Sequence, residues 1–178
     1  RFVEKKGHKY LIEALGKLAN KNEKIICRLI GDGELKKIIE KKVRDDNLTK
    51  IVKFDQSVNP DELSKIYNGA DIFVLPSVTS SNGDTEGTPA SIIEAQASGL
   101  PVVSTYHAGI PEIILDNKSG FLVNEKDSDA LADKIDLLIM NASLRRKMGE
   151  TGRNYMAKEY NQDIQTNRLI SLYKKLLA

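Results

Sequence analysis

Hydrophobic and polar positions along the chain follow two periods in turn. In residues 11–19 the apolar side chains recur at i, i+3, i+4, i+7 and i+8, the spacing of one face of a helix. Similar spacing and cap residues predict further helices at 35–43, 89–98, 127–138, 144–158 and 163–177, and another that starts over residues 59–62. Short runs rich in apolar residues predict strands at 24–30, 51–54, 71–75, 101–105 and 120–123.

The order of these elements predicts the fold class. Strands that alternate with helices form βαβ units, which build a Rossmann-like α/β fold, a parallel sheet flanked by helices. The run 71–75 is almost entirely apolar, so we expect a central strand that is buried on both faces. The last two helices, from about residue 143, have no strand between them. Their apolar residues could pack on this domain or on a second one.

Composition narrows the class of protein further. The chain has 178 residues, of which 40% are hydrophobic and 29% charged, and this suits one compact domain over residues 1–178. The net charge of +2 lacks the basic excess that a nucleic-acid partner requires. Cys27 is the only cysteine, which excludes an intrachain disulfide, and we interpret it as a small apolar residue of a buried strand. Because the chain begins at Arg1 without a methionine, we expect a fragment of a longer protein.

The loop after the strand at 71–75 carries the most unusual polar chemistry. Ligands of open α/β sheets bind outside the carboxyl ends of the strands, and this loop runs there from 76 to 88 before a helix starts. Free N–H groups of Ala90 and Ser91 and the helix dipole predict an anion site. Gly87 allows a ligand to approach the backbone. Two carboxylates, Glu86 and Glu94, flank this site without a basic residue beside them in the sequence.

The same stretch resembles a known family motif. Residues 86–103, EGTPASIIEAQASGLPVV, resemble the glutamate-seven-residues-glutamate motif of retaining GT-B glycosyltransferases, and most closely that of glycosyltransferase family 4, also called group 1. Further blocks agree with this family in the same order, namely 1–7, 70–77, 109–112 and 120–123. The resemblance covers nearly the whole chain, and it implies the C-terminal, nucleotide-sugar-binding half of a GT-B enzyme.

The resemblance also implies roles for individual residues. Three of them would be catalytic: Arg1 and Lys6 would neutralise the diphosphate of the donor, and Glu86 would contact the transferred sugar. Glu94 would hold the ribose hydroxyls. Residues 53–57 would lie near the base. The remaining residues implied to line the nucleotide-sugar site are Gly31, Gly33, Gly87, Thr88, Pro89, Ala90 and Ser91.

For the whole enzyme, the resemblance implies transfer of a sugar from a nucleotide diphosphate sugar to a glycan or lipid-linked acceptor, in cell-surface polysaccharide synthesis. The N-terminal acceptor domain is absent from this chain, so we expect the chain alone to be inactive. No metal or other cofactor is implied. We expect a cytoplasmic protein, with association to the inner membrane face through the absent domain. A nucleotide-sugar epimerase of the same architecture and a non-catalytic binding module remain as alternatives. The base, the sugar and the acceptor stay open.

Two other patterns have simpler interpretations. Gly31 and Gly33 follow a predicted strand, but the third glycine of a dinucleotide fingerprint would fall at Lys36, so we interpret them as a strand-to-helix turn. Residues 127–129 form an Asp-x-Asp sequence, which holds a divalent metal in the other large glycosyltransferase fold. Because a helical stripe follows it here, we interpret Asp127 as an N-cap.

Several residues near the predicted site remain ambiguous. His107 follows a strand, and we interpret it as a solvated loop histidine. Glu112 is either a first-turn carboxylate that faces a helix dipole or a donor contact. Lys5 is an ordinary solvated charge. Two glycines are common in the family where this chain has Ala108-Gly109, so a ligand has less room to approach the backbone there. Residues 79–84 form a polar extension that resembles exopolysaccharide-assembly members of the family.

Overall fold

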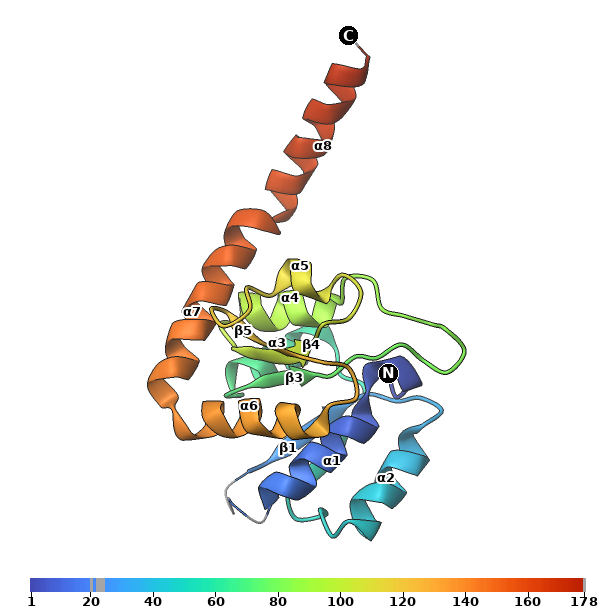
Figure 1. Cartoon of the computed structure of the whole chain (residues 1–178). Helices are drawn as coiled ribbons and strands as arrows, with labels where there is room; N and C mark the ends of the chain where they lie inside the picture. The colour runs from blue at the N-terminus through green and yellow to red at the C-terminus, as the bar shows by residue number, and fades with distance from the viewer. Residues whose placement is uncertain (20, 22–24, 178) are drawn as a thin grey trace.

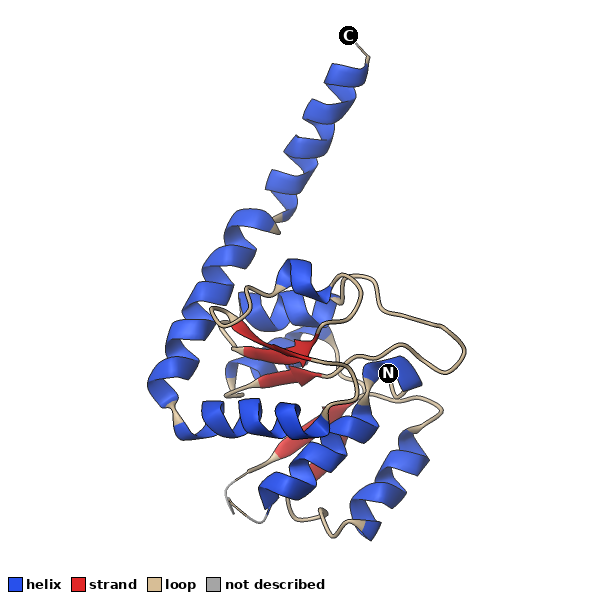
Figure 2. Cartoon of the chain, viewed as in Figure 1, coloured by secondary structure: helices blue, strands red, loops and turns tan. Residues whose placement is uncertain are grey.

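The computed structural model describes residues 1–19, 21 and 25–177, and it alternates strands and helices as the sequence predicts (Figures 1 and 2). The strands are β1 (Cys27–Ile30), β2 (Val52–Asp55), β3 (Phe73–Leu75), β4 (Val102–Thr105) and β5 (Gly120–Val123). The helices are η1 (Glu4–Lys6, 3-10), α1 (His8–Ala19), α2 (Lys36–Asp45), α3 (Pro60–Asn68), α4 (Ala90–Ala97), α5 (Ile110–Ile113), α6 (Ser128–Met140), α7 (Ala142–Glu159) and α8 (Gln162–Leu176). Residue 24, where the first strand was predicted to begin, lies outside the described residues.

All the strand pairs of the described residues are parallel. β1 pairs with β2, so that Cys27 lies opposite Val52. The second sheet has the order β3-β4-β5, in which Val102 lies opposite both Phe73 and Gly120. α1 and α6 lie on one side of the β3-β4-β5 sheet, and α4 and α5 lie on the other (Figure 1). The predicted α/β class with a parallel sheet is therefore confirmed.

The prediction that residues 71–75 form the central strand is wrong within the three-stranded sheet. β3 lies at its edge, and β4 is the central strand with all four residues buried. The sequence of β4 conceals this position because it includes Ser104 and Thr105. Their hydroxyls donate to the carbonyls of Leu75 and Ser77, each at 2.5 Å, and this satisfies the polar atoms in a buried strand.

Two clusters of buried apolar side chains form the core. The larger one joins α1, α6 and the strands, and it includes Phe2, Ile12 and Leu138. Cys27 is half-buried against it, in accordance with its interpretation as a small apolar residue. The smaller cluster lies between α4, α5 and the β3-β4-β5 sheet, and Ile92 belongs to it. Two predicted helix starts are also present, at Asn59 and Asp127, whose side chains accept the N–H groups of Glu62 and Ala130.

The two C-terminal helices differ in their packing. α7 packs closely on α4 and on the turn after it, since a Cβ added to Gly149 would lie 1.9 Å from the carbonyl oxygen of Gly99. α8 extends away from the domain (Figure 1), and none of its residues, all of which the structure describes, is buried. Its exposed apolar side chains are Leu169, Ile170, Leu172, Tyr173 and Leu176. In the described part of the chain, no helix has the length and apolar character needed to cross a membrane.

Candidate functional site

The candidate site starts at the N-terminus of α4, which follows the long loop after β3. Pro89 occupies the N-cap position in an extended conformation, and no side chain of the described residues caps the helix there. The N–H groups of the first turn have no acceptor within the helix, and Ala90 and Ser91 hold the first two positions. Ala90 is exposed and Ser91 half-buried. The helix therefore presents free amides and its positive dipole end outside the sheet, as the sequence predicts.

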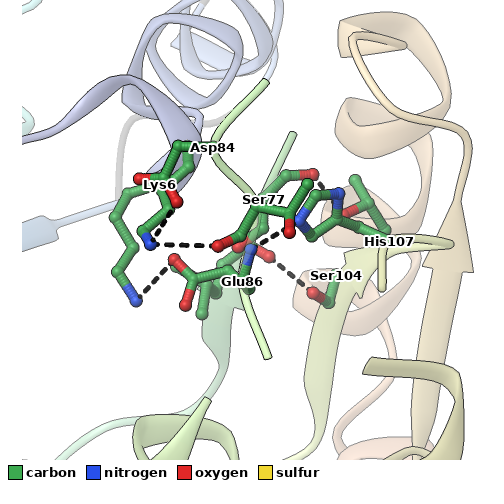
Figure 3. Close-up of polar contacts among 10 residues, drawn as sticks. Lys6, Ser77, Asp84, Glu86, Ser104 and His107 are labelled. Carbon is green, nitrogen blue, oxygen red and sulfur yellow. Dashed lines mark hydrogen bonds and ion pairs between the residues drawn. The ribbon is translucent and has the colours of Figure 1, made fainter. Parts of the chain in front are cut away.

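A half-buried ion pair is formed by the loop before this helix. The ammonium of Lys6 lies 3.0 Å from a carboxylate oxygen of Glu86 (Figure 3). The Glu86 side chain is only 9% exposed and that of Lys6 19%. No basic residue neighbours Glu86 in the sequence, but the fold supplies one from η1. Because water is largely excluded, loss of either partner would leave the other charge poorly compensated.

The segment that carries Lys6 is tied to the loop that carries Glu86. The Lys5 ammonium lies 3.1 Å from the Asp84 carboxylate and donates to the carbonyl oxygen of Thr85 at 3.0 Å. The Lys5 carbonyl oxygen accepts the N–H of Val78 at 2.9 Å. The interpretation of Lys5 as an ordinary solvated charge is therefore wrong, since its side chain is 17% exposed and holds the loop. A sequence shows no sign of this contact because the partners are distant along the chain.

His107 corrects a second expectation. It is 2% exposed, rather than solvated, and its ring lies between Glu86 and Glu125. The Glu86 N–H donates to Nε2 at 3.0 Å, and Nδ1 lies 2.5 Å from a carboxylate oxygen of Glu125. Partial burial raises the pKa of Glu125, but hydrogen bonds from the Thr79 N–H and from His107 outweigh it and leave the pKa below its ordinary value. His107 thus belongs to the surroundings of Glu86.

Glu94, in the second turn of α4, is exposed. One of its carboxylate oxygens accepts a hydrogen bond of 3.3 Å from the Tyr67 hydroxyl of α3. Burial, together with the neighbouring carboxylate, raises the pKa of Tyr67. Since only one oxygen has this partner among the described residues, Glu94 has room to accept further hydrogen bonds from a ligand at the surface.

The turn at Gly31 and Gly33 lies against the N-terminal segment, as a strand-to-helix turn. Phe2 donates its N–H to the Asp32 carbonyl oxygen at 2.9 Å and accepts the N–H of Leu35 at 3.0 Å. A Cβ added to Gly33 would lie 2.6 Å from the Phe2 nitrogen, so only glycine allows this approach. Arg1, with an exposed side chain, is thereby held beside the turn.

The remaining candidates are arranged around the loop. Gly87 and Thr88 are exposed, and a Cβ added to Gly109 would lie 3.0 Å from both the Gly87 carbonyl oxygen and the Thr88 hydroxyl. Ala108 has a left-handed φ of 44°, at the position where the family often has glycine. Glu112 is exposed in α5, and its carbonyl oxygen accepts the hydroxyls of Tyr155 and Tyr160.

Two further expectations concern the base and metals. The predicted base region, residues 53–57, begins in β2, where Asp55 pairs with Arg28 of β1 at 2.8 Å. Within the described ranges, no group of three or more His, Cys, Asp or Glu residues could hold a metal ion. The site residues and the absence of a metal requirement stay predictions, to be tested by the experiments below.

Comparison with known proteins identifies the family. The family model of glycosyl transferases group 1 matches residues 1–155. The chain belongs to this family. It is 33% identical over 177 residues to the putative colanic acid biosynthesis glycosyltransferase WcaL of Escherichia coli, covering 99% of this chain and 44% of that protein. This group 1 chain thus spans less than half the length of such relatives.

Solved structures agree with the group 1 assignment. The crystal structure of the C-terminal domain of the group 1 protein LpcC from Francisella tularensis aligns with a TM-score of 0.80 at 31% identity, covering 91% of this chain and 83% of that one. A TarM mutant of Staphylococcus aureus, solved with fondaparinux, alpha-GlcNAc-glycerol and UDP, aligns with a TM-score of 0.85 at 26% identity, covering 97% and 34%. The fold is that of a GT-B glycosyltransferase domain, and the predicted membership of group 1 is confirmed.

Proposed function

We propose that this chain is the donor-binding domain of a retaining glycosyltransferase of family 4. The whole protein would transfer a sugar from a nucleotide diphosphate sugar to a glycan or lipid-linked acceptor. WcaL, 33% identical to this chain, is named for colanic acid biosynthesis, and this supports a role in cell-surface polysaccharide synthesis. TarM, with the same fold, was solved with UDP, and this supports a nucleoside diphosphate as part of the donor.

The observation that carries the proposal is the ion pair of Lys6 and Glu86 at the N-terminus of α4. Sugar transfer leaves a diphosphate, whose growing negative charge needs fixed positive partners. The Lys6 ammonium and the amides of Ala90 and Ser91 would supply such partners, and Arg1, which lies beside Gly31, would add a second cation. Glu86, on the other side of Lys6, is placed to orient the sugar ring.

The nucleoside end of the donor would extend along the exposed part of the site. Gly87 and Thr88 leave their backbone accessible to the phosphates. Glu94 lies on the exposed face of α4, and its carboxylate would accept hydrogen bonds from the two ribose hydroxyls. The turn at Gly31 and Gly33 would form the opposite wall. No step of this scheme requires a metal, so we expect full activity in the presence of EDTA.

A second domain would complete the enzyme. The exposed apolar side chains of α8 would pack on an N-terminal acceptor domain of the longer protein, which would also provide association with the inner membrane face in the cytoplasm. Since the acceptor site would lie in that domain, the 178-residue chain alone would transfer no sugar. Transfer by the pure chain, given a donor and a glycan acceptor, would contradict this division.

The test has two parts. Calorimetric titration of the chain with UDP, GDP and ADP, and with their sugars, should find one base that binds, and a Lys6→Gln chain should bind it more weakly. Product analysis of the full-length protein with that donor should then show sugar transfer. Epimerised donor without transfer would indicate the epimerase instead. Binding without any product would indicate a binding module, and no binding by any nucleotide would refute the proposal.

A further inference from the structure

The backbone of Glu86 is held by a buried histidine that the roles above do not use. His107 lies in the turn after β4, and its ring reaches the N–H of Glu86 in the loop after β3 (Figure 3). On the other side of the ring, Nδ1 meets the carboxylate of Glu125, which follows β5. The His107 side chain is 1% exposed, so both ring nitrogens must find their partners within the protein.

These contacts determine the tautomer of the ring. The Glu86 N–H is a donor, so Nε2 must accept with its lone pair and carries no proton. The ring proton therefore lies on Nδ1 and is donated to Glu125. Glu125 is itself fixed, because it accepts the N–H of Thr79 at 2.8 Å and lies 3.4 Å from the Thr79 hydroxyl. The series of hydrogen bonds from Glu125 through His107 to Glu86 therefore has a fixed order of donors and acceptors, and it joins the loops after β3, β4 and β5.

Glu86 is thus held from two sides. His107 fixes its main chain, and Lys6 pairs with its carboxylate at 3.0 Å. Lys6 is expected to turn toward the diphosphate when a donor binds, and the carboxylate then loses part of its restraint. The bond from His107 to the backbone remains, because it does not involve any group that faces the donor. Reactions of this kind are sensitive to the placement of such a carboxylate, since a misplacement of ~1 Å can cost about 100-fold in rate.

We propose that His107, oriented by Glu125, is a positioning residue that sets where the Glu86 carboxylate lies against the transferred sugar. This role rests on the proposed function, in which Glu86 contacts that sugar. It requires the acceptor at Nε2 and not simply a polar side chain of similar volume. That requirement distinguishes positioning from packing. Asn and Gln at position 107 test it, because the side-chain amide of each takes the place of one ring nitrogen.

The experiment compares His107→Asn with His107→Gln in the full-length protein. The longer Gln side chain can bring its amide oxygen to the place of Nε2 and accept the Glu86 N–H. The shorter Asn reaches only the place of Nδ1, where it can donate to Glu125. Tyr106→Phe is the matched control, since it removes the bond of 2.8 Å from the Tyr106 hydroxyl to Asp116 in the same turn without touching Glu86. Thermal melts of all variants check that each is folded.

Two measurements separate positioning from packing. In His107→Asn, hydrogen exchange of the Glu86 amide should become about tenfold faster, as expected for the loss of one hydrogen bond. The kcat of this variant should fall about 10- to 100-fold while its KM for the donor changes little, since the nucleotide contacts are intact. His107→Gln should restore the protection of the amide and recover most of kcat. Tyr106→Phe should leave both quantities unchanged.

The outcomes distinguish this inference from the proposed function. If Asn and Gln at position 107 give the same exchange and the same kcat, the side chain acts by packing and the inference is overturned. The inference is likewise overturned if both variants have the exchange rate and the kcat of the parent protein. If the parent transfers no sugar at all, the proposed function is refuted, whereas faster exchange of the Glu86 amide in His107→Asn, reversed in His107→Gln, still supports the hold on the backbone.

Discussion

Gly7→Ala should separate the segment that carries Lys6 from the loop that carries Glu86. Gly7 ends η1 with a φ of 64°, a left-handed conformation that costs a residue with a Cβ about 1–2 kcal/mol. The added Cβ would also lie 1.8 Å from the carbonyl oxygen of Pro76, where the loop after β3 begins. Relief of such an overlap by backbone shifts costs typically about 1–3 kcal/mol more. The free energy of unfolding should therefore fall by roughly 2–5 kcal/mol.

Urea unfolding followed by circular dichroism measures this change. The matched control is Gly16→Ala in the middle of α1, where, apart from the adjoining residues and backbone of the helix itself, no atom of the described residues lies within 4 Å of the added Cβ. That substitution should stabilise the chain by about 0.5–1 kcal/mol, because glycine in a helix interior is unfavourable. If Gly7→Ala unfolds at the same urea concentration as the parent, the contact with Pro76 relaxes without cost and the reasoning is wrong.

Three further predictions concern the site and its surroundings. Glu94→Gln should weaken binding of the bare nucleoside diphosphate about 10- to 100-fold, since a charge-assisted hydrogen bond contributes roughly 1.5–3 kcal/mol. Glu86→Gln should leave that binding almost unchanged, and equal losses in calorimetry would contradict this division of roles. Ala108→Gly should raise the free energy of unfolding by about 0.5–1 kcal/mol, because glycine relieves the left-handed φ of 44° at an exposed position; an unchanged urea midpoint would argue against strain there. Burial, with the nearby charges of the N-terminal ammonium and of Lys6, lowers the pKa of His8 from 6.5 to about 4. Between these two pH values the unfolded chain protonates His8 and the folded chain does not. The free energy of unfolding is therefore highest above pH 6.5 and falls on acidification, by about 2–3 kcal/mol between pH 7 and 4.5. His8→Phe should remove this part of the pH dependence, and identical pH profiles would show that His8 does not contribute.

Local signals in the sequence predict the elements well. Asn59 and Asp127 cap helices because the groups they satisfy lie three residues away. The short helix α5 agrees with one of the two interpretations of Glu112, that of a first-turn carboxylate after Pro111. In each case the decisive interaction lies within one turn of the residue that signals it.

Contacts between distant segments are harder to predict. Ser104 and Thr105 make β4 look unsuited to a central position, and only the carbonyls of the neighbouring strand and loop satisfy them. The sequence suggests that His107 is solvated, because both of the partners that bury it come from other loops. The resemblance selects Lys6 and Glu86 as site residues, but it does not predict that the two pair with each other. Composition and spacing do not specify such pairings, because the folding of the whole sheet brings the partners together.

The exposed side chains of α8 affect how the chain can be studied in solution. An environment-sensitive dye would bind this helix in the native state and give a high signal before any unfolding. The sequence contains no tryptophan, so intrinsic indole fluorescence offers no substitute. Because no residue of α8, which the structure describes throughout, is buried, its unwinding does not have to accompany the loss of the core. Far-ultraviolet melts of the isolated chain should therefore lose helix in two steps, and the later step reports on the domain.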